Sequence, residues 1–264
     1  MHEDRVSLFP KIVTILVLIF LVAPLVVIIL ASFSPTVLVV FPPKGFSLKW
    51  YANIFTSSTN FLSGLGNSLK VAIVATLIDI VLGVAAALSV TRYTFKGKHL
   101  LIAFFTSPMY VPSIAFAFVL LRVFSMIGGV PAYLRILLGH SIIIIPYIIR
   151  NTIAVLAGYN WLLEDAAASL SANPLQTFTK VTLPLIKPGI MAGALLSFLY
   201  SFDEAVLGSL LSSPRFITLP IRIMNYMEFS FDPTLAAIST LLIVMSLTSI
   251  VLMERLIGLD MFLK

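Results

Sequence analysis

Over its 264 residues the chain has no cysteine, which excludes a disulfide framework and thiol chemistry. Charge is also scarce: 11% of the residues are charged and 59% are hydrophobic, whereas a soluble domain carries about 25% charged residues. A soluble domain is therefore excluded, and the first partner to expect is the lipid bilayer. The net charge of +6 comes without a clustered basic face, so nucleic acid is not an expected partner.

Motifs for catalysis and cofactor binding are lacking as well. The segments Gly64-Leu65-Gly66 and Lys96-Gly97-Lys98 are too short for a phosphate-binding loop and lack its strand–loop–helix setting. The three histidines, His2, His99 and His140, are too dispersed for an obvious metal site. No serine or carboxylate catalytic set is visible. We therefore expect no ATP hydrolysis, no enzymatic activity and no bound metal or cofactor in this chain itself.

Long apolar runs are what the sequence does contain. A chain of this length has room for about six spans of roughly 20 residues with short loops. Six runs are present, at 12–31, 67–91, 100–121, 133–156, 189–211 and 234–253. The first is longer than a secretory signal core and five more follow, so it is expected to be a retained span. No internal repeat stands out, and we expect an all-α integral membrane protein with one transmembrane domain over 1–264.

Basic residues near the span ends predict the orientation. Arg92, Lys96 and Lys98 lie in a short loop between the second and third runs, whereas the much longer segment 32–66 carries only two lysines. Placing the basic loop inside puts both termini in the cytoplasm. The segment 163–190 then also faces the cytoplasm.

That segment is a polar interruption between two apolar runs, and its pattern predicts two short amphipathic helices joined by a turn. The first is indicated by residues at helical spacing, Leu163, Ala166, Ala167 and Leu170. Asn173 followed by Pro174 predicts the start of the second helix. Pro184 and Pro188 are expected to end it. A helical hairpin between two spans presents a surface to a partner in the water phase.

The same residues resemble the EAA loop of bacterial ABC importer permeases, whose pattern is Glu-Ala-Ala, three residues, Gly, and Leu-Pro further on. Asp165 stands at the Glu position and Ser171 at the Gly position, so two signature residues depart from the pattern. Both changes look tolerable, since Asp keeps the charge and Ser171 can remain in a helical turn. The resemblance implies an ATPase-coupling loop made of Glu164, Asp165, Ala166, Ala167, Ser171, Leu183 and Pro184.

Within that family the chain is most similar to spermidine/putrescine-type permeases, through 42–51, 92–98 and 201–204. The resemblance implies a type I importer in the bacterial inner membrane. Two ATP-binding subunits would hold ATP and Mg, and a second, related permease chain would complete the path. An extracytoplasmic solute-binding protein would deliver the substrate, a polyamine or another small organic cation.

Charged residues within the spans are the candidates for the substrate path, because each is costly unless paired or hydrated. Asp203 and Glu204 are adjacent in the fifth run, where a helix would point them about 100° apart. One could face the path and attract a cation; alternatively both lie near the external end and bind water or partner helices. Asp79 and Arg150 are expected to form a structural ion pair or polar packing contact rather than to contact substrate.

Two further interpretations remain open at this level. A secondary transporter or channel would explain the spans and buried charges, but it would not explain the hairpin, and inverted repeats are not apparent. In the segment 32–66, Ser47 can cap a short helix that carries Trp50 and Tyr51. That helix could either anchor the chain at the headgroups or receive a binding protein.

Overall fold

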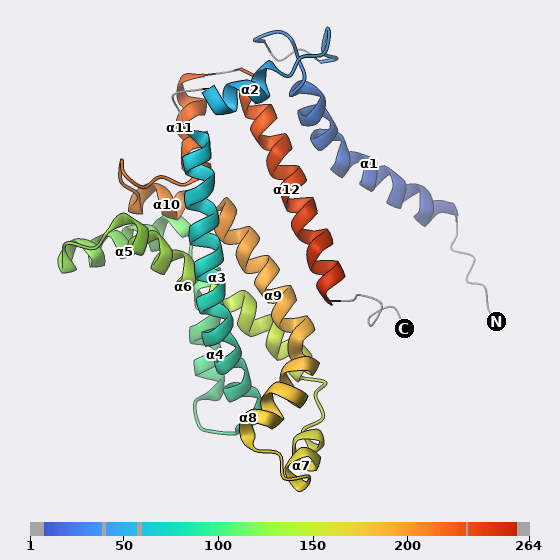
Figure 1. Cartoon of the computed structure of the whole chain (residues 1–264), viewed down its shortest axis with the longest axis vertical. Helices are drawn as coiled ribbons and strands as arrows, with labels where there is room; N and C mark the ends of the chain where they lie inside the picture. Colours follow the sequence, from blue (N-terminus) through green and yellow to red (C-terminus); the bar gives the residue numbers. More distant parts are fainter. Residues whose placement is uncertain (1–7, 39–40, 57–59, 231, 258–264) are drawn as a thin grey trace. The chain divides into compact units, whose positions relative to one another are not determined.

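The computed structural model describes residues 8–38, 41–56, 60–230 and 232–257, so His2 and both chain ends lie outside it. The described helices, in chain order, are α1 (Leu8–Ala31), α2 (Lys49–Thr56), α3 (Phe61–Arg92), α4 (Lys98–Thr106), α5 (Ser113–Ile127), α6 (Ala132–Leu156), α7 (Leu162–Ser169), α8 (Pro174–Thr177), α9 (Leu183–Asp203), α10 (Val206–Leu211), α11 (Leu219–Phe229) and α12 (Thr234–Ile257) (Figure 1). A 3₁₀ turn follows α4 and a π-helical turn, Phe178–Thr182, follows α8. Over these residues the chain forms no β-strand, and the all-α prediction is confirmed.

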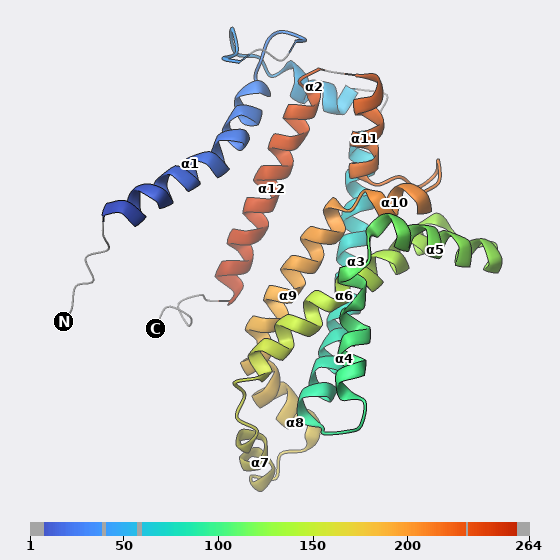
Figure 2. The same cartoon turned by 180° about the vertical axis from the view of Figure 1, so that it is seen from behind.

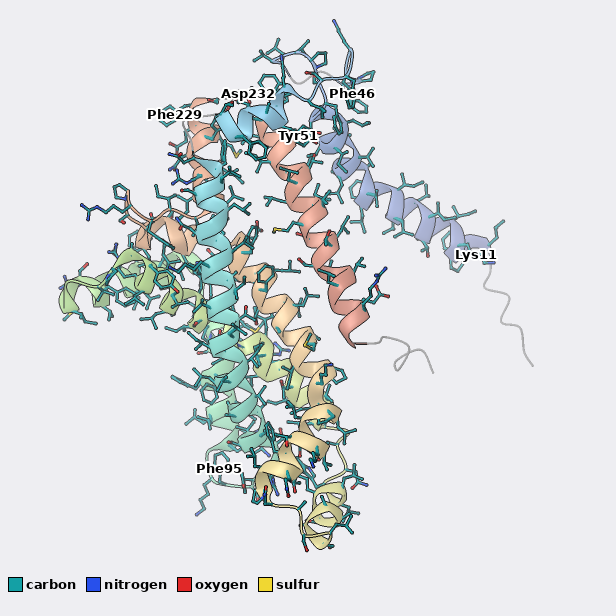
Figure 3. All side chains as sticks on the ribbon, viewed as in Figure 1. Lys11, Phe46, Tyr51, Phe95, Phe229 and Asp232 are labelled. Atoms are coloured by element: carbon teal, nitrogen blue, oxygen red, sulfur yellow. The ribbon has the colours of Figure 1, made fainter. Side chains whose placement is uncertain are left out.

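Several of these helices suit a bilayer. Within the described residues, five helical runs are long and apolar enough to cross a membrane: α1, α3, α6, Pro174–Asp203 and the part of α12 up to Leu252. A sixth is reached if the bent pair that contains α4 and α5 is one span, so the count of six stays a prediction. Apolar side chains project from α1 along its length (Figure 3). Such a surface is stable in lipid and costly in water.

The third predicted span is bent. Lys98–Tyr110 and Ser113–Ile127 meet at 104°. Val111 lies between them in an extended conformation, with φ −89° and ψ 128°. This is the conformation that the following Pro112 imposes on its neighbour. Pro112 thus accompanies a break in this span, whereas α6 continues as a helix through Pro146.

The chain divides into two compact units, Met1–Phe61 with Asn225–Ser246, and Leu62–Met224 with Leu247–Lys264. In the first unit, α2 is tied to the chain that follows α1. The Trp50 indole donates a hydrogen bond to the Ser34 carbonyl at 2.7 Å. The Ser47 hydroxyl accepts one from the Lys49 N–H at 3.3 Å, which agrees with its predicted capping role. The single-domain prediction stays a prediction.

The second unit is built on the antiparallel packing of α6 against α9, which lie side by side in both views (Figures 1 and 2). Small residues recur at every fourth position along the face of α9 that meets α6: Gly189, Gly193, Ser197 and Ser201. A Cβ at Gly193 would lie 2.8 Å from the Ile148 Cα. The two backbones therefore approach so closely that this position accepts only glycine, as is common between helices in membranes.

Hydrogen bonds complete the same contact. The Ser197 hydroxyl donates to the Ile144 carbonyl at 3.1 Å, and the Ser201 hydroxyl is hydrogen-bonded to Nδ1 of His140 at 2.8 Å. All of these groups are buried. In a medium without water a polar side chain needs such a partner. His140 thus belongs to the helix contact.

The boundaries predicted for the fifth span are wrong at both ends. Pro184 and Pro188 do not end the second hairpin helix, because the chain stays helical from Pro174 to Asp203. Pro184 lies in the first turn of α9, directly after the π-helical turn. Proline has no N–H to donate to the preceding turn, and the wider π-helical turn accommodates its ring. At the other end the helix stops at Asp203, well before residue 211.

Candidate functional site

The helices α7 and α8 form the hairpin that the sequence predicts within 163–190. Just before α7, the Asn160 side chain accepts a hydrogen bond from the Leu162 N–H at 3.1 Å, which turns the chain into the helix. Asn173 and Gln176 then cap α8 reciprocally. The Asn173 Oδ1 accepts from the Gln176 N–H at 2.9 Å, and the Gln176 Oε1 accepts from the Asn173 N–H at 3.0 Å. Local sequence therefore accounts for the two helices, as predicted. The side of the membrane on which they lie stays a prediction.

The turn between them corrects the expectation for Ser171. Instead of remaining in a helical turn, Ser171 has a φ of 64°, in the left-handed region. The Ala172 N–H donates to the Ala167 carbonyl at 3.1 Å, and the Ser171 N–H donates to the Ala168 carbonyl at 2.9 Å. This is the helix-ending pattern in which glycine is preferred. The glycine of the EAA pattern therefore stands where the backbone needs a positive φ, and serine meets that need at a cost in conformational energy.

The neighbouring acids Glu164 and Asp165 occupy opposite environments. Glu164 is 6% exposed and points away from the solvent, whereas Asp165 is exposed. One oxygen of Glu164 accepts a hydrogen bond from the Thr182 hydroxyl at 2.6 Å. Its other oxygen forms an ion pair with the Arg92 guanidinium at 2.7 Å. The buried charge is thus compensated from two sides.

Two aromatic residues surround this pair. The Tyr159 phenol donates to the Glu164 Oε1 at 3.4 Å and to the Thr182 Oγ1 at 3.3 Å. Burial raises the pKa of the Tyr159 phenol, so it stays protonated and able to donate at neutral pH. The Arg92 guanidinium lies 5.5 Å from the centre of the Trp161 ring, in a cation–π contact.

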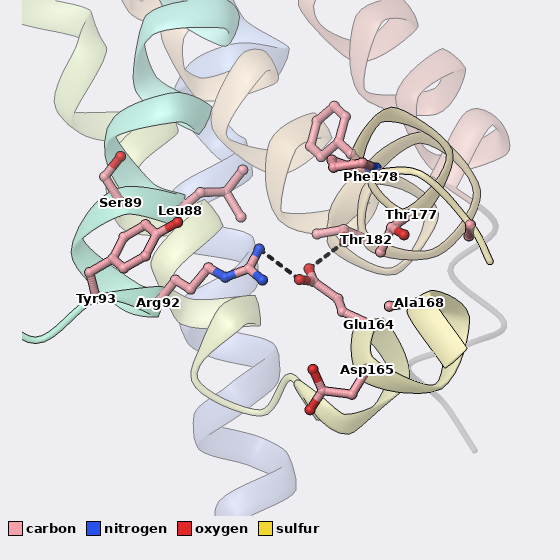
Figure 4. Close-up of a pocket in the computed structure, with 12 residues that line it drawn as sticks. Leu88, Ser89, Arg92, Tyr93, Glu164, Asp165, Ala168, Thr177, Phe178 and Thr182 are labelled. Atoms are coloured by element: carbon pink, nitrogen blue, oxygen red, sulfur yellow. Dashed lines mark hydrogen bonds and ion pairs between the residues drawn. The ribbon is translucent and has the colours of Figure 1, made fainter. Parts of the chain in front are cut away.

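A cleft of about 300 Å³ lies beside the ion pair, between the end of α3 and the hairpin (Figure 4). Arg92 and Tyr93 line it from α3, and Asp165 and Phe178 line it from the hairpin side. Figure 4 shows the Arg92 and Glu164 side chains meeting across this space. Leu183 and Pro184 lie beyond it, in the first turn of α9.

The roles of Arg92, Thr182 and Tyr159 are missed by reading the sequence. Arg92 reads there as one cation of a basic loop, and nothing local links it to Glu164. Glu164 stands between Leu163 and the exposed Asp165 in the first turn of α7, so the local pattern gives little sign that it is buried. The pairing depends on how α3 and the hairpin come together in space.

Asp203 and Glu204 do not share a helix, so the expected 100° separation on one helix is wrong. α9 ends at Asp203, and Glu204 is extended, with φ −69° and ψ 111°. Glu204 is 8% exposed, and its Oε1 accepts a hydrogen bond from the Leu207 N–H at 2.8 Å, in the first turn of α10. Asp203 is exposed. Of the two carboxylates, Asp203 is therefore the one available to a solute.

Asp79 and Arg150 are not paired. Asp79 is fully buried on α3, and its polar neighbour is Ser141 of α6. Arg150 is exposed on α6, where its guanidinium lies 3.9 Å from the Met109 sulfur. The two residues face different neighbours, so of the two expected alternatives the ion pair is wrong, and a polar packing contact stays a prediction.

Comparisons with known proteins agree with this architecture. Residues 79–259 match the family model described as "Binding-protein-dependent transport system inner membrane component". The spermidine/putrescine transport system permease protein PotC of Haemophilus influenzae is 31% identical over 80% of this chain and 82% of its own length. The putrescine transport system permease protein PotI of Escherichia coli is 31% identical over 85% of this chain and 82% of its own.

A crystal structure of a bacterial alginate ABC transporter, in complex with an alginate pentasaccharide-bound periplasmic protein, shares the fold. Its TM-score is 0.68 at 19% identity, over 94% of this chain and 91% of that chain. Family membership excludes the secondary transporter or channel that the sequence leaves open. This chain belongs to the family of binding-protein-dependent transport system inner membrane components, the multi-pass permease subunits of type I ABC importers.

Proposed function

We propose that this permease translocates a small organic cation, a polyamine such as spermidine or putrescine, which an extracytoplasmic binding protein delivers. Relatives named for polyamine transport support the substrate class, at 31% identity over most of the chain. The exposed carboxylate of Asp203 at the end of α9 supports it physically, because a fixed negative charge attracts a cation. The helical hairpin with its exposed Asp165 carries the assignment to an ATP-driven system.

The hairpin surface is suited to a protein partner. Leu170 and Leu175 are 85% and 71% exposed on either side of the turn. Asp165 and Ala166 are exposed nearby on α7. An apolar tip beside a carboxylate is unfavourable in water and favourable in a groove of complementary shape and charge. In this proposal the groove belongs to an ATP-binding subunit in the cytoplasm, which holds ATP and Mg.

The assembly in this proposal contains two ATP-binding subunits, this chain and a second, related permease chain. Both termini of this chain lie in the cytoplasm. Closure of the ATP-binding subunits moves each hairpin as a rigid body. Because α8 runs into α9 without a break in helical structure, that movement reaches the α6–α9 contact directly.

The two carboxylates at the far end of α9 take different roles. Asp203 contributes to the substrate path. Glu204 holds the first turn of α10 through the Leu207 N–H, so its role is to position the chain rather than to contact substrate.

Reconstitution tests this function. The importer, with its ATP-binding subunits, second permease chain and binding protein, is expected to accumulate labelled putrescine or spermidine in vesicles when ATP is present. The permease chain alone is the control, and it should neither hydrolyse ATP nor accumulate substrate.

A neutral or acidic saccharide is the informative competitor, because the alginate transporter has the same fold. Preferential uptake of the saccharide would overturn the polyamine assignment while leaving the ABC permease in place. ATP hydrolysis by the isolated chain would contradict the division of labour between subunits.

A further inference from the structure

The ion pair between Arg92 and Glu164 joins two parts of the chain that belong to different elements. Arg92 is the last residue of α3, and Glu164 lies in the first turn of α7. The same carboxylate accepts a hydrogen bond from Thr182, the last residue before α9. One buried side chain of the hairpin therefore contacts the end of one span and the start of another.

We propose that Glu164, Arg92 and Thr182 are positioning residues that carry movement of the hairpin into α3 and α9. The neighbouring Asp165 takes no part in this link and belongs to the surface that meets the ATP-binding subunit. The inference rests on the proposed function, since it assigns the route by which an ATP-driven movement enters the spans.

The link is strong because of where its charges lie. The Glu164 side chain is 7% exposed and the Arg92 side chain is 49% exposed. Exposed pairs contribute little to stability, but separating this one would leave a carboxylate buried without its cation. Trp161 supports the guanidinium from a second side. Arginine suits this position, because a planar guanidinium can bind a carboxylate and stack on an aromatic ring together.

The cleft beside the ion pair indicates that the pair connects two separate elements. A cavity of about 300 Å³ lies between α3 and the hairpin, and the Arg92 and Glu164 side chains meet across it. The hairpin itself is stabilised by other groups, namely the cap formed by Asn173 and Gln176 and the turn at Ser171. Loss of the pair is therefore expected to detach the hairpin from α3 without unfolding it.

The experiment uses the complete importer in vesicles and measures substrate taken up per ATP hydrolysed. Glu164→Gln and Arg92→Gln should each hydrolyse ATP at rates near wild type, while uptake per ATP falls about fivefold or more, at the lower end of typical coupling effects. The double variant should lose no more than the worse single variant, because both changes break one interaction. Arg92→Lys should couple better than Arg92→Gln. Lys96→Gln, in the same loop and exposed, is the matched control and should resemble wild type.

Hydrogen exchange provides a second measurement that does not depend on transport. In the purified complex, Glu164→Gln should increase exchange at the backbone amides of α7 while those of α9 keep their protection.

Each result has a defined meaning. If wild type itself does not couple hydrolysis to uptake, the proposed function fails. If wild type couples hydrolysis to uptake and both glutamine variants take up as much substrate per ATP as wild type, the link is overturned. The same conclusion holds if the variants form fewer complexes but each assembled complex couples normally.

Discussion

Two pairs of adjacent acids, Glu164 with Asp165 and Asp203 with Glu204, lie at opposite ends of the helical run from Pro174 to Asp203, and they share one property. In each pair one carboxylate is buried and bound, Glu164 at one end and Glu204 at the other. Its neighbour, Asp165 or Asp203, is exposed. In each pair of adjacent acids, one carboxylate therefore makes contacts within the fold, and the other is accessible to a partner or a solute.

The pairs differ in what compensates the buried charge. Glu164 has a full cation, Arg92, from a distant helix. Glu204 has a backbone N–H in the first turn of the adjoining α10, where the helix dipole favours a negative charge. The first arrangement connects separate elements, and the second shapes a local turn. The hairpin end therefore connects separate elements, whereas the other end fixes the start of α10 beside an exposed carboxylate.

The largest expected effect comes from breaking the scaffold that both ends share. Gly193→Leu would drive a side chain into the backbone of α6 at Ile148. Overpacking of this kind costs about 1–3 kcal/mol, and more where backbone must move. Thermal unfolding of the complex in detergent should show a clear fall in melting temperature, with loss of uptake. Gly66→Ala meets no atom within 4 Å and is the control; equal stability of the two variants would contradict the tight α6–α9 packing.

Next in size is the exposed acid of the hairpin. Asp165→Lys should release the ATP-binding subunit or uncouple its hydrolysis, because a reversed charge opposes a groove selected for an anion. A bulky residue at Ala167, which is half-buried beside the turn, should act similarly by distorting the surface. Copurification and transport-coupled ATP hydrolysis measure both effects. If charge and bulk are tolerated there without change, the hairpin is not the coupling element.

The acids at the other end should respond differently from each other. Asp203→Asn is expected to lower cation uptake several-fold, since an attraction of about 1 kcal/mol is lost at a hydrated site. Glu204→Ala should leave substrate affinity near wild type and lower stability by about 1 kcal/mol, the usual net contribution of one hydrogen bond. Uptake kinetics and thermal unfolding, measured on the same samples, separate the two. Unchanged uptake in Asp203→Asn would remove Asp203 from the substrate path, and reduced uptake at normal stability in Glu204→Gln would place Glu204 there instead.

The smallest effect is expected at the hairpin turn. Ser171→Gly should stabilise the hairpin by about 0.5–1 kcal/mol, because glycine adopts a positive φ without the steric cost that serine bears. Ser171→Val should destabilise it. Hydrogen exchange in α7 and α8 is the appropriate measurement, and slower exchange in the valine variant than in the glycine variant would contradict the left-handed turn.

Much of the architecture follows from local sequence. Apolar runs of span length predict the membrane helices, because lipid requires each backbone group to be bonded within its own segment. Asn173-Pro174 predicts the start of α8, and the extended Val111 before Pro112 is likewise a local effect, since both depend only on the dihedral angles of neighbouring residues. The hairpin pattern, with its resemblance to a coupling loop, was also sufficient to predict the family.

Tertiary structure alone decided which acid of each pair is buried, that Arg92 rather than Arg150 finds a carboxylate, and that the helical run from Pro174 continues through Pro184 into α9. Burial depends on which elements meet in space, and spacing along the chain does not specify those meetings. The left-handed Ser171 falls between the two cases. Its position in the pattern marked a glycine site, but only the folded turn showed the backbone conformation that the glycine serves.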